Sequence, residues 1–154
     1  MQSGTPSFFV AGIVQGSIAG KEIHSQAYRE KIRSILRAQF PNSQLIDPLE
    51  LHPNSVAYGP TKARRVFLEH IEVASQVDIL ICYLPEASMG TGMEMYEAHK
   101  RGRLVVTITP LSSNWAIRTL SDRVLPDLDA FARFVHSGGL GRLWKRKSGK
   151  TSSP

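Results

Sequence analysis

The sequence has a single cysteine, Cys82, and no apolar run approaching the roughly 18 residues that a helix needs to cross a bilayer. One cysteine excludes an internal disulfide, and its place inside an apolar stretch is typical of a small buried side chain. The first residues, MQSGTPS, lack the basic and apolar regions of a secretory signal peptide. We therefore expect a cytoplasmic protein that does not bind membranes.

Acidic residues are also scarce. The chain has 13 of them against 19 lysines and arginines, which gives a net charge of +6. Residues 138–154 hold five of the basic residues and no acid, so that the rest of the chain carries only +1 of the +6. No aromatic residues interleave with these charges in the manner of a nucleic-acid platform, and nucleic acid is not the expected partner. We predict one domain over residues 1–137 and a basic, flexible tail over 138–154, with residues 142–154 dispensable for folding and catalysis.

The order of apolar segments predicts an α/β fold. Short apolar runs predict strands over 7–14, 43–47, 77–84 and 103–109, with a last short strand at RVLP, and helical periods cover 25–40, 61–75, the segment ending at KRG, and DLDAFARFVHS. Residues 48–60 are predicted as a long loop, and SSNWAIRTLSD as a short helix or a loop. This alternation favours a single-domain, doubly wound (Rossmann- or flavodoxin-like) parallel sheet of about five strands with helices on both faces.

Two glycine-bearing loops follow the first and third predicted strands, at the edge where such sheets bind ligands. The first loop contains QGSIAGKE (15–22), and the second contains ASMGTG (87–92). The first loop lacks the glycine spacing of a dinucleotide fingerprint, but its backbone amides suit one phosphate or a sugar hydroxyl. The second loop, ASMGTG, offers the hydroxyl of Ser88 and the exposed amides of Gly90 and Gly92 at a predicted helix start, which suits an anion. We expect the two loops to face each other across one crevice.

Glu94 is predicted to lie in the first turn of the helix that follows the Gly-Thr-Gly turn. One interpretation is that its carboxylate stabilises the helix dipole. The other is that it attacks the anomeric carbon of a sugar whose phosphate is held by the same turn. We expect the dipole and the nearby amides to lower the pKa of this carboxyl. Histidines and acids show no metal-ligand spacing, so neither a metal nor a cofactor is expected.

The segments PEASMGTGMEMYEAHKRGRLVVTITP, FFVAGIVQGS…AYREKI and IEVASQVDILI resemble the nucleoside 2-deoxyribosyltransferase superfamily. The similarity extends loosely over residues 8 to 130. The resemblance implies an α/β enzyme that cleaves or exchanges the N-glycosidic bond of 2-deoxynucleosides or of their 5′-monophosphates. It also implies a homodimer, or a larger oligomer, in which a neighbouring subunit completes each site.

The resemblance assigns roles to individual residues. Glu94 falls on the glutamate nucleophile, and Ser88 falls where the monophosphate hydrolases of the family have a phosphate-binding serine, which implies a nucleotide substrate. Asn114 falls where those hydrolases present a serine to the partner subunit's phosphate. The remaining implied substrate contacts are the first-loop residues and an aromatic residue of the first helix: Gly12, Ile13, Gln15, Gly16, Ser17 and Tyr28.

Two positions depart from the family pattern. His70 stands where the family has its acidic helper, and Phe9 replaces a tyrosine near the start of the first strand. His70 either donates a proton to the leaving base, because an unperturbed imidazole titrates near neutrality, or is an ordinary histidine of the helix surface. The departures leave two alternatives open: a non-catalytic nucleotide-binding sensor of the same fold, or an enzyme like the phosphoribohydrolases, whose motif GTGMEMYE partly matches.

Overall fold

The computed structural model describes residues 4–18, 20 and 22–150. Five parallel strands form one sheet in the order β2-β1-β3-β4-β5, which confirms the predicted fold class. The strands are β1 Phe8–Gly12, β2 Leu45–Ile46, β3 Ile79–Tyr83, β4 Leu104–Ile108 and β5 Arg123–Leu125. Each lies within the segment predicted from its apolar run, and each is shorter than that segment.

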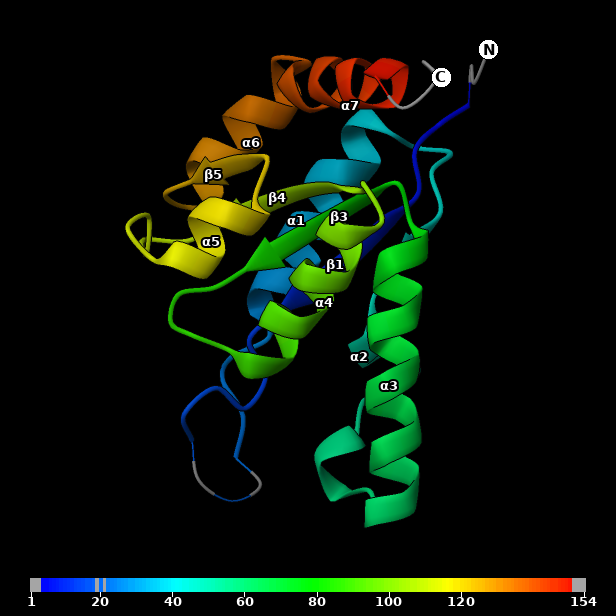
Figure 1. The fold of residues 1–154 in the computed structure, drawn as a ribbon, viewed down its shortest axis with the longest axis vertical. Coiled ribbons are helices and arrows are strands. Elements are labelled where there is room, and N and C mark those ends of the chain that lie inside the picture. Colours follow the sequence, from blue (N-terminus) through cyan, green and yellow to red (C-terminus); the bar gives the residue numbers. More distant parts are fainter. Residues whose placement is uncertain (1–3, 19, 21, 151–154) are drawn as a thin grey trace.

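The helices connect these strands and cover both faces of the sheet (Figure 1). They are α1 Ala27–Gln39, α2 Pro48–Leu51, the 3-10 turn η1 Ser55–Ala57, α3 Pro60–Gln76, α4 Met89–Lys100, α5 Trp115–Leu120, α6 Leu128–His136 and α7 Gly139–Lys150. Two of them, α2 and η1, lie inside the stretch predicted as a loop over 48–60. Within the described residues no helix is both long and apolar enough to traverse a bilayer.

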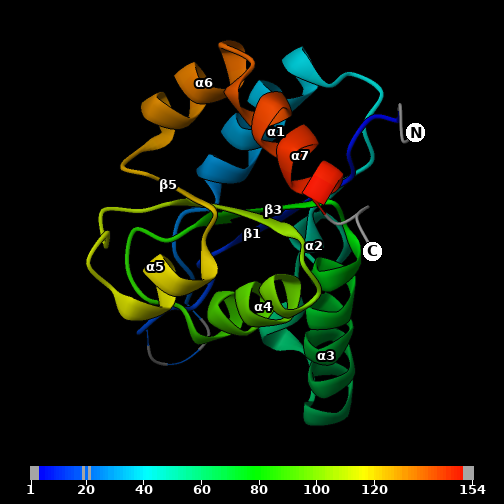
Figure 2. The same ribbon diagram turned by 45° about the horizontal axis from the view of Figure 1, so that its top comes forward.

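Alternate side chains of each strand enter two separate cores, as the period of two in a strand requires. Phe8 and Val10 of β1 pack in one core with residues of α1, α6 and α7. Phe9 and Ala11 point to the other face, into a core that residues of α3, α4 and α5 complete. Figure 2 shows the two groups of helices on opposite sides of the sheet. Burial on both faces explains why the strands read as continuous apolar runs.

The point where the strand order reverses places the functional loops side by side. The chain passes from β1 to the edge strand β2 and then returns to form β3 on the other side of β1. Directly after β1, the amide of Ile13 donates a hydrogen bond to the carbonyl of Tyr83 at the end of β3, at 3.1 Å. The segments that leave β1 and β3 therefore start from adjacent points, where open α/β sheets bind their ligands.

The C-terminal segment differs from the flexible tail that its composition predicts, because residues 139–150 form helix α7. Leu140 is fully buried and Trp144, one helical turn later, is 9% exposed, and both belong to the core on the α1 side of the sheet. Lys147 fixes the helix at its other end by donating hydrogen bonds to the carbonyl of Arg103 and to the carboxylate of Asp122. Residues 151–154 of the predicted tail lie outside the described residues.

Because Trp144 is buried, we expect the segment to contribute to the stability of the fold. We expect Trp144→Ala to lower the free energy of unfolding by about 3 kcal/mol, the usual effect of removing a buried tryptophan side chain. Urea denaturation measures this change. The matched control is Lys145→Ala at the neighbouring exposed position, with an effect within about 0.5 kcal/mol. Equal stabilities of the two variants would show that α7 does not contribute to the core.

Candidate active site

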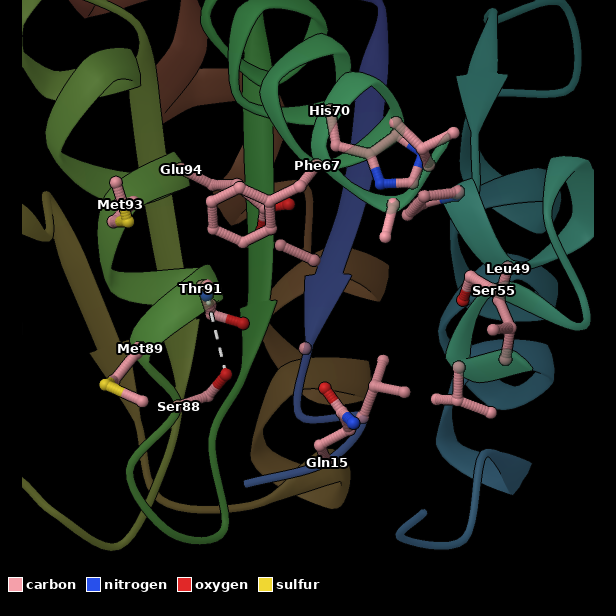
Figure 3. A pocket seen from close by; sticks show the side chains of 18 of the residues that line it. Gln15, Leu49, Ser55, Phe67, His70, Ser88, Met89, Thr91, Met93 and Glu94 are labelled. Carbon is pink, nitrogen blue, oxygen red and sulfur yellow. Dashed lines mark hydrogen bonds between the residues drawn. The ribbon is translucent and has the colours of Figure 1, made fainter. Parts of the chain in front are cut away.

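A pocket of about 650 Å³ opens at the carboxyl end of β1. Helices α3 and α4 form one side of it, the first loop and the buried end of α1 form its base, and α2 with η1 forms the opposite wall. Figure 3 shows side chains from these elements pointing into one space, among them Glu94, His70, Ser88 and Gln15. Seven of the twelve predicted site residues line it: Gly12, Gln15, Gly16, His70, Ser88, Gly90 and Glu94. The volume is in the range typical of small-molecule sites.

Helix α4 begins earlier than its sequence predicts. Ser88 is the N-cap, and its hydroxyl accepts a hydrogen bond from the amide of Thr91 at 3.5 Å. Gly90, Thr91 and Gly92 are therefore part of the helix and do not form a separate turn in front of it. Glu94 lies in the second turn and not in the first. Glu94 is therefore not placed to stabilise the helix dipole, because a carboxylate does so only within the first turn.

The carboxyl of Glu94 is the acidic group of the described pocket lining. It faces the pocket and is partly buried, and within the described part of the chain no hydrogen bond or ion pair engages it. Burial raises the pKa of Glu94 to about 7, although the positive charge of Arg29 lowers it. The predicted lowering of this pKa was wrong, because desolvation outweighs the favourable charges. Near neutral pH the side chain is a mixture of carboxylate and carboxylic acid.

His70 is not an ordinary histidine of the helix surface. Its ring lines the pocket, and its Nε2 atom is buried without a hydrogen-bond partner in the described structure. Burial lowers the pKa of His70, and the neighbouring His52, whose ring centroid lies 5.4 Å away, lowers it further. His70 is therefore neutral at pH 7. Phe9 packs edge-on against it at 6.4 Å between centroids.

The first loop is shaped by close packing around two glycines. A Cβ atom at Gly12 would lie 2.8 Å from two ring carbons of Tyr28, so no larger residue fits at the end of β1. Gly16 adopts a φ of +54°, and a Cβ there would lie 2.8 Å from Nε2 of His24. His24 in turn pairs with Glu86 at 2.8 Å, which connects the first loop to the segment after β3. The loop residues that line the pocket are thus held from both sides.

Several predicted contact residues do not line the pocket. Tyr28 is buried beneath the first loop, where its hydroxyl donates to the carbonyl of Ile13 at 3.0 Å and its ring stacks on Tyr83. Asn114 caps α5 by accepting hydrogen bonds from the amides of residues 116 and 117. The other residues outside the lining are Ile13, Ser17 and Gly92. Their predicted roles toward a substrate stay predictions.

The structure also adds lining residues that sequence reasoning missed. Arg29 reaches the base of the pocket from α1 although it is only 4% exposed. A wall from residues 48–58 includes Leu49, Ser55, Val56 and Tyr58. This wall carried no sequence signal, because it is built by the stretch predicted as a loop. Phe67 lines the pocket from α3, which was predicted as a helix. The described residues contain no group of three or more histidine, cysteine or acidic side chains placed to hold a metal ion.

The raised pKa of Glu94 has a consequence for stability. A carboxyl whose folded pKa exceeds its unfolded value of 4.5 favours the fold when protonated, and this stability is lost as the pH rises from 4.5 to about 7. Glutamine never ionises, so Glu94→Gln should be more stable than the wild type at pH 8, by about 2 to 3 kcal/mol, with little difference near pH 4.5. Urea denaturation at the two pH values measures this, with Glu97→Gln as the control on the same helix. A Glu94→Gln protein no more stable than wild type at pH 8 would contradict the burial argument.

Comparisons with known proteins agree with this architecture. No protein-family model matches the sequence, and no curated protein matches it significantly. Solved structures do match. A 2-deoxyribosyltransferase from the psychrotolerant bacterium Bacillus psychrosaccharolyticus has a TM-score of 0.58 and 16% identity, over 82% of this chain and 90% of that one. A conserved protein from Enterococcus faecalis V583 has a TM-score of 0.58 and 17% identity, over 87% of this chain and 99% of that one.

A third structure is the CMP N-glycosidase BcmB from Clostridium botulinum, with a TM-score of 0.51 and 14% identity, over 84% of this chain and 98% of that one. At such identities the similarity concerns the fold, and it extends over nearly the full length of each neighbour. The resemblance found in the sequence motifs is thereby confirmed at the level of architecture. The fold of this chain is similar to the folds of these three structures.

Proposed function

We propose that the protein is an N-glycosidase that cleaves, or exchanges, the bond between base and sugar in a (2-deoxy)nucleoside 5′-monophosphate, with Glu94 as the nucleophile. The observation that carries this proposal is the carboxyl of Glu94, which faces a pocket of nucleotide size without any partner of its own. The fold shared with a 2-deoxyribosyltransferase and a CMP N-glycosidase supports a reaction of this class.

The two ends of the pocket differ in chemistry in a way that suits a nucleotide. The wall formed by Leu49 and Val56 is apolar and gives a base a surface to pack on. The other end presents the hydroxyl of Ser88, the amide side chain of Gln15 and the N-terminus of the 12-residue helix α4, a polar end that suits a phosphate. Glu94 lines the same pocket further along α4 than Ser88, and in this proposal the sugar of such a ligand lies beside it.

The reaction needs the ionised form of Glu94. Its carboxylate oxygen attacks C1′ of the sugar, the bond from C1′ to the base nitrogen breaks, and the electron pair of that bond leaves with the base. The product is an ester between the sugar and Glu94. In hydrolysis, water attacks C1′ of this ester. In transfer, a second nucleobase attacks the same carbon. Either attack releases the carboxylate of Glu94. Because the pKa of Glu94 is about 7, the rate should rise as the pH increases through neutrality.

His70 supports the leaving base through a hydrogen bond in this scheme. Its pKa is lowered, so that the imidazole is neutral over the pH range where Glu94 is ionised. A neutral imidazole has one N–H and one lone pair, and its unpartnered Nε2 atom faces the pocket. Donation of the N–H to an acceptor on the base stabilises the charge that develops there. The carboxylic acid that the family uses at this position would instead transfer a proton.

A panel of nucleoside 5′-monophosphates and the matching nucleosides tests the proposal. We expect chromatography to detect free base from at least one monophosphate, at a rate at least tenfold higher than from its nucleoside, because the end of the pocket at Ser88 binds the phosphate. Both ribose and 2-deoxyribose forms belong in the panel, with and without an added acceptor base. Nucleosides that react as fast as their monophosphates would overturn the assignment of the phosphate end.

Replacing the nucleophile separates binding from chemistry. Glu94→Gln keeps the size of the side chain and removes its charge, so we expect base release to fall by at least a thousandfold while calorimetry shows monophosphate binding equal to or tighter than wild type. Glu97→Gln, three residues along α4 and outside the pocket lining, is the matched control with unchanged turnover. A Glu94→Gln protein that retained turnover within a few-fold would show that another group attacks the sugar.

A second candidate is a non-catalytic nucleotide sensor. The observation in its favour is the charge state of the two groups, because His70 is neutral and a large share of Glu94 is protonated near pH 7. Tight monophosphate binding without base release across the panel at pH 6 to 9 would establish this alternative in place of the enzyme.

We also propose that the protein forms a homodimer through one face of α4. Met89, Met93 and Tyr96 form a stripe along this helix, and their side chains are 87%, 48% and 54% exposed. Trp115, at the start of the neighbouring α5, is 86% exposed. Met89 and Met93 also line the pocket, so the stripe is continuous with its mouth. A second copy packed on this stripe would cover apolar surface and bring its own Asn114 and Trp115 toward the pocket.

Light scattering tests the dimer. We expect about twice the 17.1 kDa chain mass at micromolar concentration, and a monomer for Tyr96→Glu, which places a charge in the stripe without altering the pocket lining. Leu51→Glu is the matched control, because Leu51 is 66% exposed on α2 and lies outside the stripe. A wild-type monomer would disprove the proposal.

A further inference from the structure

We infer that the buried ion pair between Arg29 and Asp47 sets the charge state of Glu94, which makes Arg29 a positioning residue of the site and Asp47 the group that limits its effect. The importance of this for catalysis rests on the proposed function, whereas the electrostatic coupling itself does not. The inference starts from the place of Arg29, which is buried in the protein and yet contributes to the lining of the same pocket as Glu94.

The guanidinium of Arg29 is fixed by the protein on several sides. It donates to the carbonyl of Val10 at 2.9 Å, to the carboxylate of Asp47 at 3.0 Å, to the side-chain oxygen of Gln26 at 2.8 Å, and to the carbonyl of Gly12 at 3.4 Å. The side chains of Arg29 and Asp47 are only 5% and 3% exposed. A charge held this firmly beside a pocket acts on it at a constant distance.

These contacts distinguish Arg29 from an ordinary phosphate ligand. The four hydrogen bonds occupy four of the five N–H groups of the guanidinium, so it cannot offer the two-pronged contact by which arginine binds phosphate. Its influence on the pocket is exerted mainly by its charge. Arg29 lines the pocket and Asp47 does not, so the positive member of the pair is the one presented to the cavity.

Three other titratable groups near Glu94 carry no charge near neutral pH. Burial raises the pKa of Tyr28 on α1 and of Cys82 on β3, so both are neutral, and burial lowers the pKa of His70 on α3, so it is neutral as well. Arg29 and Arg64 of α3 are the cationic side chains of the described lining, and Arg29 is the one whose charge lowers the pKa of the Glu94 carboxyl against the effect of burial. The more strongly Asp47 neutralises Arg29, the less ionised Glu94 becomes.

Two variants of the pair should shift Glu94 in opposite directions. Asp47→Asn keeps an oxygen that accepts from Arg29 and from the amide of Leu49, which the carboxylate caps at 3.0 Å, and it removes only the negative charge. The pKa of Glu94 should fall by about one pH unit. The double variant Arg29→Gln with Asp47→Asn removes both charges without leaving a buried ion unpaired, and the pKa should rise by a similar amount.

Carbon-13 NMR of protein labelled at the glutamate side-chain carboxyl measures these shifts in the free protein, and Glu94→Gln identifies the signal. Asp78→Asn is the control, because Asp78 accepts hydrogen bonds from Ser7 at the opposite end of β3. It should leave the titration of Glu94 unchanged. Cooperative urea unfolding of each variant establishes that it is folded.

Opposite shifts in the two variants, with none in the control, support the inference. Unchanged titration in both folded variants, or a shift in the same direction in both, overturns it, because a purely structural pair would not move the pKa of Glu94 in opposite directions. Base release, measured against pH on the same proteins, should show its acidic limb moving with the NMR titration. Shifts seen by NMR in a protein that releases no base would uphold the coupling and refute the proposed function.

Discussion

One buried interaction, the ion pair between Arg29 and Asp47, joins the parts from which the pocket is made. The guanidinium holds the last carbonyl groups of β1, and the carboxylate caps α2, which begins the opposite wall. The end of a central strand and a wall formed by an irregular segment are therefore tied to the same point. Breaking one partner would leave an uncompensated charge in the core, which is why such pairs resist substitution of one member alone.

Burial has opposite energetic effects in the sheet and in the site. In the two cores, apolar side chains fill both faces of the strands, and burial stabilises the fold. At the pocket the same low-dielectric surroundings act on an unpartnered carboxyl and an unpartnered imidazole nitrogen, and burial there is unfavourable. A site of this kind persists because the surrounding structure is stable enough to hold groups that would be better solvated elsewhere, which is common at functional sites.

Sequence patterns were sufficient for the architecture, and they identified seven residues that the structure brings together in one pocket. Continuous apolar runs identified the strands, because both faces of this sheet are covered. The start of α4 was misplaced because Gly90 and Gly92 are poor helix formers, and the capping by Ser88 outweighs them. The tail was misjudged because its charges and glycines masked the spacing of Leu140 and Trp144. Arg29 did carry a signal, since it shares a helix face with Ile32 and Leu36, and a charge on a buried face needs a buried partner. That partner became visible only with the fold.

The titration of Glu94 near pH 7 also makes the pocket a proton-coupled binding site. An anionic ligand placed beside this carboxyl would raise its pKa further, so that binding takes up protons from the solvent at neutral pH. By the reciprocity of linked equilibria, protonation would in turn strengthen binding. Affinity for the ligand and the ionisation required for attack on the sugar then respond to acidity in opposite senses: acidification favours occupancy of the pocket, and alkalinity favours turnover of what is bound.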